Sequence, residues 1–155
     1  MSYTLDTSVL AKAIIPPRRR KQDSIFIEQQ RLFTIAKSFL AKIENSQEIM
    51  NIPSIALVEI AAVAARLTGK DERGIQATSF VKKHGNIIHD TSFLDEAVRI
   101  ASQIHISGFD SIFIACAKIT NSTLITDDKT MHDAAISLSI SSILLREINV
   151  NNSAD

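Results

Sequence analysis

Short apolar runs alternate along the chain with longer stretches in which apolar residues recur at the spacing of a helix. The short runs predict buried strands at residues 2–5, 49–52, 86–89, 122–126 and 140–145. The longer stretches predict helices over residues 24–44, 55–67, 71–85, 91–105, 109–119 and 129–138. Because strands that alternate with helices are typical of βαβ units, we predict a three-layer α/β/α fold with a central parallel sheet of about four to five strands.

The composition is that of a globular domain without a strong electric field. Hydrophobic residues make up 45% of the 155 residues and charged residues 22%, and the formal net charge is zero. This length fits a single domain over residues 1–148, with a frayed tail at 149–155. Any binding to nucleic acid must therefore come from a local patch of charge.

The cysteine content and the hydropathy bear on the compartment. Cys116 is the only cysteine, so no disulfide can form within the chain. We find no pattern of a signal peptide, and no apolar run approaches the roughly 18 residues needed to span a bilayer. These observations predict a cytoplasmic protein that does not enter a membrane.

Acidic residues interrupt several stretches that are otherwise apolar. Glu59 is the only charged residue in "IALVEIAAVAA", and Asp110 is the only charged residue from position 109 to 117. Asp6 stands where the first predicted strand ends, and Asp127 and Asp128 end the fourth. An unpaired carboxylate is costly on a buried helix, so such an acid must face a partner, water or a cation.

Each acid also has a purely structural interpretation. Asp6 and Asp110 could cap helices, Glu59 could pair with an arginine across a packing seam, and Asp127 with Asp128 could form a solvated turn. The predicted topology, however, brings them together. In a doubly wound sheet, strand ends and helix beginnings lie at one edge, which is where ligands bind. We therefore predict that these acids share one rim.

Carboxylates gathered at one rim favour a hard divalent cation. Like charges within a few ångströms cannot all stay ionised unaided, and oxygen ligands select Mg²⁺ or Mn²⁺. A zinc site is disfavoured, because Cys116 lies within an apolar helix and no histidine pair has ligand spacing. One or two such ions suit phosphodiester hydrolysis, since they activate a water and stabilise the leaving oxygen.

Four sequence segments carry a family resemblance. They are "LDTSVL" around Asp6, "SIALVEIAA" around Glu59, "GFDSIFIACA" around Asp110, and "LITDDKTM" ending the fourth strand. With these segments in this order, the chain resembles PIN-domain ribonucleases, and in size and layout the VapC toxins of toxin–antitoxin pairs. The resemblance implies a PIN-like fold, a metal-dependent endoribonuclease acting on RNA, a VapB-like antitoxin as partner, and a homodimer.

The resemblance also implies roles for individual residues. Asp6, Glu59, Asp110 and Asp128 match the acidic quartet that binds metal and catalyses cleavage, and Thr126 and Ser8 match polar accessory positions. The family usually has a non-acidic residue where Asp127 stands, so either Asp127 or Asp128 could reach the metal. Spacing favours Asp128.

A basic segment follows the first apolar stretch. The residues "RRRK", Arg18, Arg19, Arg20 and Lys21, could bind RNA phosphates, since local basic contacts supply most non-specific affinity for nucleic acid. A solvated loop after Pro16 and Pro17 is the equal alternative.

Other functions compete with a toxin nuclease. The chain could be an RNA-binding or assembly module without catalysis, or a housekeeping RNA-processing nuclease. A phosphatase of the haloacid-dehalogenase type would need a second aspartate two positions after Asp6, where Ser8 stands. A response receiver would need paired acids after the first strand and a lysine after the last, and neither is found.

Overall fold

The computed structural model describes residues 1–45 and 47–149. Five strands are present in this part of the chain: β1 (Ser2–Leu5), β2 (Ile49–Pro53), β3 (Asn86–Ile88), β4 (Thr123–Thr126) and β5 (Ser142–Leu144). Seven α-helices accompany them: α1 (Thr7–Ile14), α2 (Ser24–Glu44), α3 (Ile55–Thr68), α4 (Asp71–His84), α5 (Leu94–Ile104), α6 (Gly108–Ile119) and α7 (Lys129–Ser137). Two 3₁₀ turns complete the description, η1 (Asp90–Ser92) and η2 (Leu145–Glu147).

The five strands form one parallel sheet in the order β3-β2-β1-β4-β5. The order reverses at β1, because β2 and β3 lie on one side of it and β4 and β5 on the other. Such a reversal opens a crevice at the carboxyl ends of the strands. Asp6 directly follows the central strand β1, so this acid lies at the crevice.

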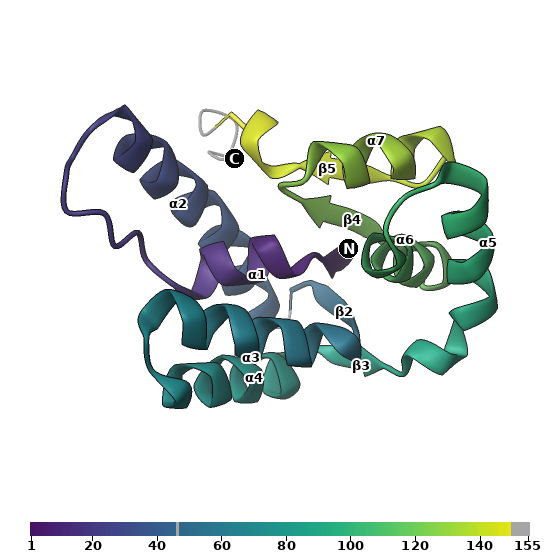
Figure 1. Ribbon diagram of the computed structural model, residues 1–155, viewed down its shortest axis with the longest axis horizontal. Helices are drawn as coiled ribbons and strands as arrows, with labels where there is room; N and C mark the ends of the chain where they lie inside the picture. Colours follow the sequence, from purple (N-terminus) through teal and green to yellow (C-terminus); the bar gives the residue numbers. More distant parts are fainter. Residues whose placement is uncertain (46, 150–155) are drawn as a thin grey trace.

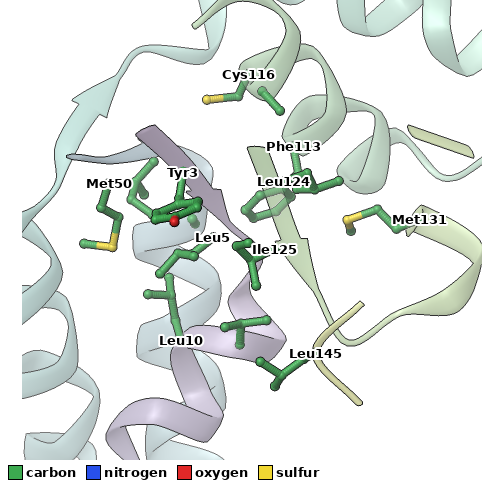
Figure 2. Packing of buried hydrophobic residues seen from close by; sticks show 14 of the residues in the cluster. Tyr3, Leu5, Leu10, Met50, Phe113, Cys116, Leu124, Ile125, Met131 and Leu145 are labelled. Atoms are coloured by element: carbon green, nitrogen blue, oxygen red, sulfur yellow. The ribbon is translucent and has the colours of Figure 1, made fainter. Parts of the chain in front are cut away.

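Helices cover both faces of the sheet, which confirms the predicted three-layer α/β/α fold. Figure 1 shows α1 to α4 on one side and α5 to α7 on the other. The core is built from the apolar strands and the helix faces next to them. Figure 2 shows side chains that meet there: Leu5 from β1, Leu124 and Ile125 from β4, Leu10 from α1, and Phe113 from α6.

The beginning of α3 agrees with the prediction, whereas that of α5 differs. Ser54 occupies the first cap position of α3, but its side chain does not cap the helix and instead donates to Asp90 Oδ2 at 2.9 Å. The predicted helix over 91–105 is split into η1 and α5 at Phe93, which is buried in the core. Burial of this ring therefore outweighs the helical periodicity. The predicted tail at 149–155 lies outside the described residues except for Asn149.

Helices α3 and α4 pack closely at Gly74. A Cβ atom added to Gly74 would lie 2.6 Å from the main-chain oxygen of Ala61. We expect Gly74→Ala to lower the free energy of unfolding by about 1–3 kcal/mol in urea titrations, because the helices must move apart. The matched control is Gly108→Ala, which meets nothing within 4 Å and should be neutral or slightly stabilising. An unchanged stability for Gly74→Ala would contradict this packing argument.

No helix in the described part of the chain is long and apolar enough to cross a membrane.

Candidate active site

Asp6 lies buried between β1 and α1. It holds the cap position of α1, but its side chain makes no cap hydrogen bond, so the structural interpretation as a helix cap is wrong. Instead, its Oδ2 accepts hydrogen bonds from Ser8 Oγ at 2.6 Å and from Thr126 Oγ1 at 2.9 Å. Two hydroxyl groups from distant parts of the chain therefore orient this carboxylate.

Glu59 projects from the second turn of α3 toward α1. Its Oε2 accepts a hydrogen bond from Thr7 Oγ1 at 2.6 Å. The alternative of an arginine partner is wrong, because a hydroxyl group next to Asp6 in the sequence holds this carboxylate instead. Thr7 thus couples the second acid to the first.

Asp110 lies in the first turn of α6. The cap of this helix is Ser107, whose Oγ accepts a hydrogen bond from the main-chain nitrogen of Asp110 at 3.1 Å. The side chain of Asp110 is therefore not needed as the cap. Phe109 beside it is exposed at the same helix beginning.

Asp128 caps α7 at the carboxyl end of β4. Its Oδ1 accepts hydrogen bonds from the main-chain nitrogens of Thr130 at 2.7 Å and Met131 at 3.1 Å. Its own main-chain nitrogen donates to Thr126 Oγ1 at 3.0 Å. Because Thr126 also donates to Asp6, this one hydroxyl group links Asp128 to the central acid.

Asp127 has a different environment from Asp128, and the predicted solvated turn is wrong for it. The side chain of Asp127 is buried, with Oδ2 at 3.1 Å from Lys12 Nζ and Oδ1 at 2.9 Å from Arg146 Nε. Arg146 also donates to the main-chain oxygen of Asp127 at 2.7 Å. Asp127 is therefore neutralised by the protein's own cations, whereas Asp128 faces outward.

A cavity of about 720 Å³ lies against three of the four predicted acids. Asp6, Glu59 and Asp110 line it, and Asp128 is connected to it through Thr126. Three basic residues from separate elements also line the cavity: Lys12, Arg18 and Arg66. The remaining wall is largely apolar and includes Ile15, Phe33, Val63, Leu67, Phe109 and Phe113.

The acids of the cavity influence one another electrostatically. Burial raises the pKa of Asp6, and the charge of Asp110 adds to the rise, although the hydroxyl groups of Ser8 and Thr126 oppose it. Burial also raises the pKa of Glu59, with the charges of Asp6 and Asp110 contributing. The pKa of Asp110 is raised by its burial and by the charge of Asp128. The charge of Asp110 thus acts on both Asp6 and Glu59, and the charge of Asp128 acts on Asp110.

Within residues 1–45 and 47–149, no ion pair involves Asp6, Glu59 or Asp110. No group of three or more acidic, histidine or cysteine side chains in these ranges is close enough to hold a metal as the side chains are placed. The chemistry of the donors nevertheless fits Mg²⁺ or Mn²⁺, because all of them are carboxylate or hydroxyl oxygens.

The predicted basic segment is divided by the structure. Arg18 lines the cavity and donates to the main-chain oxygen of Leu67 at 3.3 Å. Arg19 pairs with Asp23, the residue that caps α2. Arg20 and Lys21 are exposed, and neither is among the residues that line the described cavity.

Sequence reasoning missed Lys12 and Arg66 in the cavity wall. For Lys12 a signal existed, because it is the only charged residue in the apolar stretch "TSVLAKAII". This is the same pattern that identified Glu59. Arg66 ends an apolar helix, where a basic residue is common for helix stability alone.

Comparison with protein families gives one decisive match. The model of the PIN domain matches residues 3–137, which is most of the chain. The chain belongs to the PIN-domain family. The matched range contains Asp6, Glu59, Asp110 and Asp128. Comparison with curated proteins gives no significant match.

Solved structures share the fold of this PIN domain at low sequence identity. A chain of VapBC2 from Rickettsia felis, bound to a DNA fragment from its promoter, is 18% identical with a TM-score of 0.58, over 92% of this chain and 98% of that one. FitAcB from Neisseria gonorrhoeae is 15% identical with a TM-score of 0.59, over 94% and 99%. VapBC-1 from nontypeable Haemophilus influenzae is 16% identical with a TM-score of 0.59, over 95% and 100%.

The raised pKa of Asp6 has a consequence for the stability of the PIN domain. A carboxyl whose pKa is raised by folding contributes stability below its unfolded pKa, about 3.9, and loses that contribution as the pH rises through the folded value. In EDTA we therefore expect the free energy of unfolding of Asp6→Asn, relative to that of the wild type, to be higher at pH 7 than at pH 4. Urea titrations at both pH values measure this difference. A difference that is constant or shrinks with pH would contradict it.

Proposed function

We propose that this PIN domain is a Mg²⁺- or Mn²⁺-dependent endoribonuclease and the toxin of a toxin–antitoxin pair. The observation that carries the nuclease proposal is the charge of the cavity. Asp6, Glu59 and Asp110 share it with raised pKa values, and none has a cationic side chain as partner in the described residues. A divalent cation would supply the missing charge.

The proposed roles follow from the hydrogen bonds of each acid. Asp6, Asp110 and Asp128 would hold one or two ions, with Ser8 and Thr126 orienting the carboxylate of Asp6. The cap of α7 uses Oδ1 of Asp128, and Oδ2 takes part in neither of those bonds. When bound, the ion would supply an activated water and stabilise the leaving oxygen.

Glu59 would bind the ion directly or through water, and would orient the attacking water. Its bond from Thr7 holds Oε2 against α1, beside Asp6. Asp127 is not assigned to the metal, because Lys12 and Arg146 already compensate its charge.

The proposals for the substrate and the partner rest on the basic residues of the cavity and on the shared fold. Basic residues around an acidic cavity suit a polyanion, which supports RNA as substrate. The shared fold with chains of VapBC and FitAB assemblies supports a VapB-like antitoxin as partner. A homodimer and a cytoplasmic location belong to the same proposal.

The nuclease proposal is tested with purified protein and a long single-stranded RNA. We expect cleavage in Mg²⁺ or Mn²⁺, none in EDTA, and none of a DNA of the same sequence. Inactivity in metal combined with tight RNA binding in EDTA would instead favour an RNA-binding module. Cleavage that is equal in EDTA and in metal would contradict the metal-dependent mechanism.

The toxin proposal needs a separate experiment. Induced expression should stop bacterial growth, and co-expression of the protein encoded next to this gene should restore it. Cleavage of RNA in vitro without any effect on growth would point to a housekeeping nuclease.

A further inference from the structure

One face of α1 forms part of the cavity wall. Thr7, Ser8, Ala11, Lys12 and Ile15 all line the cavity, at the spacing of successive turns. Ser8 donates to Asp6 at the beginning of the helix, and Lys12 lies one turn further along the same face. Along this face, Lys12 therefore lies about 6 Å of helix rise beyond Ser8, which contacts Asp6.

Lys12 is held in place by the buried Asp127. Its Nζ lies 3.1 Å from Asp127 Oδ2, and the lysine side chain is 33% exposed. Arg146 occupies the other carboxylate oxygen, Oδ1, at 2.9 Å, and the main-chain oxygen at 2.7 Å. Asp127 thus connects α1 to the chain after β5 and fixes the side chain of Lys12, a residue that lines the cavity.

The three charged groups do not cancel. Asp127 carries one negative charge and its two partners carry one positive charge each, and Lys12 is the member of this group that lines the cavity. Arg146 donates one hydrogen bond to the carboxylate oxygen Oδ1 of Asp127 and a second to its main-chain oxygen, so it pairs with this acid independently of Lys12. The ammonium of Lys12 has three protons, and its described ion pair uses one carboxylate oxygen.

We propose that Lys12 binds the phosphate next to the scissile one in the RNA strand, and that Asp127 positions it for this contact. The inference rests on the proposed nuclease function. One helical turn separates Lys12 from the Ser8–Asp6 pair, and this is comparable to the step between successive phosphates of an extended strand. Arg18 and Arg66 also line the cavity and add positive charge to its wall.

The first test compares Lys12→Met with the wild type on a single-stranded RNA whose cleavage site has been mapped. We expect KM to rise about 10-fold with kcat nearly unchanged, because the contact is made equally in the ground state and the transition state. The slope of log(kcat/KM) against log salt concentration should become shallower by about 0.7. Lys12→Arg should retain most of the affinity.

The matched control is Lys118→Met. Lys118 also pairs with an acid, Glu96, but it does not line the cavity. Its KM and salt dependence should equal those of the wild type. Equal losses in both lysine variants would overturn the proposal, since they would reflect general charge rather than position.

The second test removes the charge from the substrate instead of the protein. A single uncharged methylphosphonate linkage is placed one nucleotide to either side of the cleaved bond. At one of these two positions, the uncharged linkage should raise the KM of the wild type about 10-fold. The same linkage should not raise the KM of Lys12→Met beyond its value for the unmodified RNA. A loss in Lys12→Met equal to that in the wild type at both positions would overturn the proposal.

A purely structural role for Lys12 makes a different prediction. If Lys12 served only to neutralise Asp127, then adding Asp127→Asn to Lys12→Met would restore the wild-type KM. We expect the double variant to keep the raised KM. Should Lys12→Met fail to fold, Lys12→Gln takes its place in both tests, because the wild type alone does not separate a contact of Lys12 from one of Arg18 or Arg66.

Failure of this inference is distinguishable from failure of the proposed function. A wild type that does not cleave RNA in metal overturns the nuclease proposal, and this inference with it. A wild type that cleaves with the same KM as Lys12→Met overturns the role of Lys12 alone.

Discussion

Asp6→Asn is expected to reduce metal-dependent RNA cleavage by at least about 10²–10³-fold while the protein stays folded. The amide can still accept the hydrogen bonds from Ser8 and Thr126, so the local geometry is preserved. What it loses is the negative charge that a divalent cation requires. Asp110→Asn should behave in the same way, because Asp110 lines the same cavity and its charge acts on Asp6.

Initial rates of RNA cleavage in Mn²⁺ measure this effect, and circular dichroism checks the fold. The matched control is Asp95→Asn, since Asp95 is an exposed acid in the first turn of a helix that does not line the cavity. Its activity should be that of the wild type. Undiminished cleavage by both Asp6→Asn and Asp110→Asn would remove the proposed mechanism.

Metal binding adds a readout that is independent of catalysis. Mn²⁺ should raise the melting temperature of the wild type, because a ligand that binds only the folded state stabilises it. The same addition should have little effect on Asp6→Asn. In EDTA at pH 7 we expect the opposite order of melting temperatures, with Asp6→Asn above the wild type. The reason is that the buried, ionised carboxylate of Asp6 raises the free energy of the folded wild type.

Asp127→Ala is expected to lower the free energy of unfolding by about 1–3 kcal/mol at pH 7. The substitution leaves Lys12 and Arg146 without their shared buried acceptor and releases α1 from the chain after β5. Exposure of both cations to solvent keeps the loss below that of a fully buried pair. Thermal or urea unfolding measures the change.

The pH dependence of this loss has a definite sign. Burial tends to raise the pKa of Asp127, but the hydrogen bonds from Arg146 and Lys12 lower it overall. A carboxyl with a lowered folded pKa contributes stability above its unfolded pKa and loses it as the pH falls through the folded value. The difference between wild type and Asp127→Ala should therefore shrink on acidification.

The control for Asp127 is Asp133→Ala. Asp133 also pairs with a lysine, Lys129, but both side chains are exposed. The expected loss is below about 1 kcal/mol, since exposed ion pairs contribute little. Equal losses at Asp127 and Asp133 would contradict the idea that the buried network anchors the site.

Substitutions of the two neighbouring aspartates should thus have different effects, with Asp127→Ala lowering stability and Asp128→Asn lowering activity. Asp128→Asn is expected to reduce cleavage with little loss of stability, because the amide oxygen can still accept the cap bonds from Thr130 and Met131. No feature of the sequence other than spacing distinguished these two acids. The structure distinguishes them by their partners, and activity and stability measurements on both variants can check the assignment.

Much of the fold follows from local patterns. The apolar run before Asp6 and the apolar runs at β2 and β4 form neighbouring parallel strands, because buried strands are recognisable by continuous apolar sequence. The break at Phe93 was not predictable in this way. A large aromatic side chain can interrupt a helix when it packs into the core instead. The core site that holds Phe93 is formed by other elements, so the local sequence does not reveal it.

The sequence by itself determined the layers of this PIN domain and the edge at which its acids gather. Apolar periodicity reveals which segments are strands or helices, and parallel topology then places strand ends and helix beginnings together. Only the tertiary structure decided which charges remain uncompensated. Lys12 and Arg146 are far apart in the chain, and they meet at Asp127 because packing of α1 and β5 against β4 brings them within hydrogen-bonding distance.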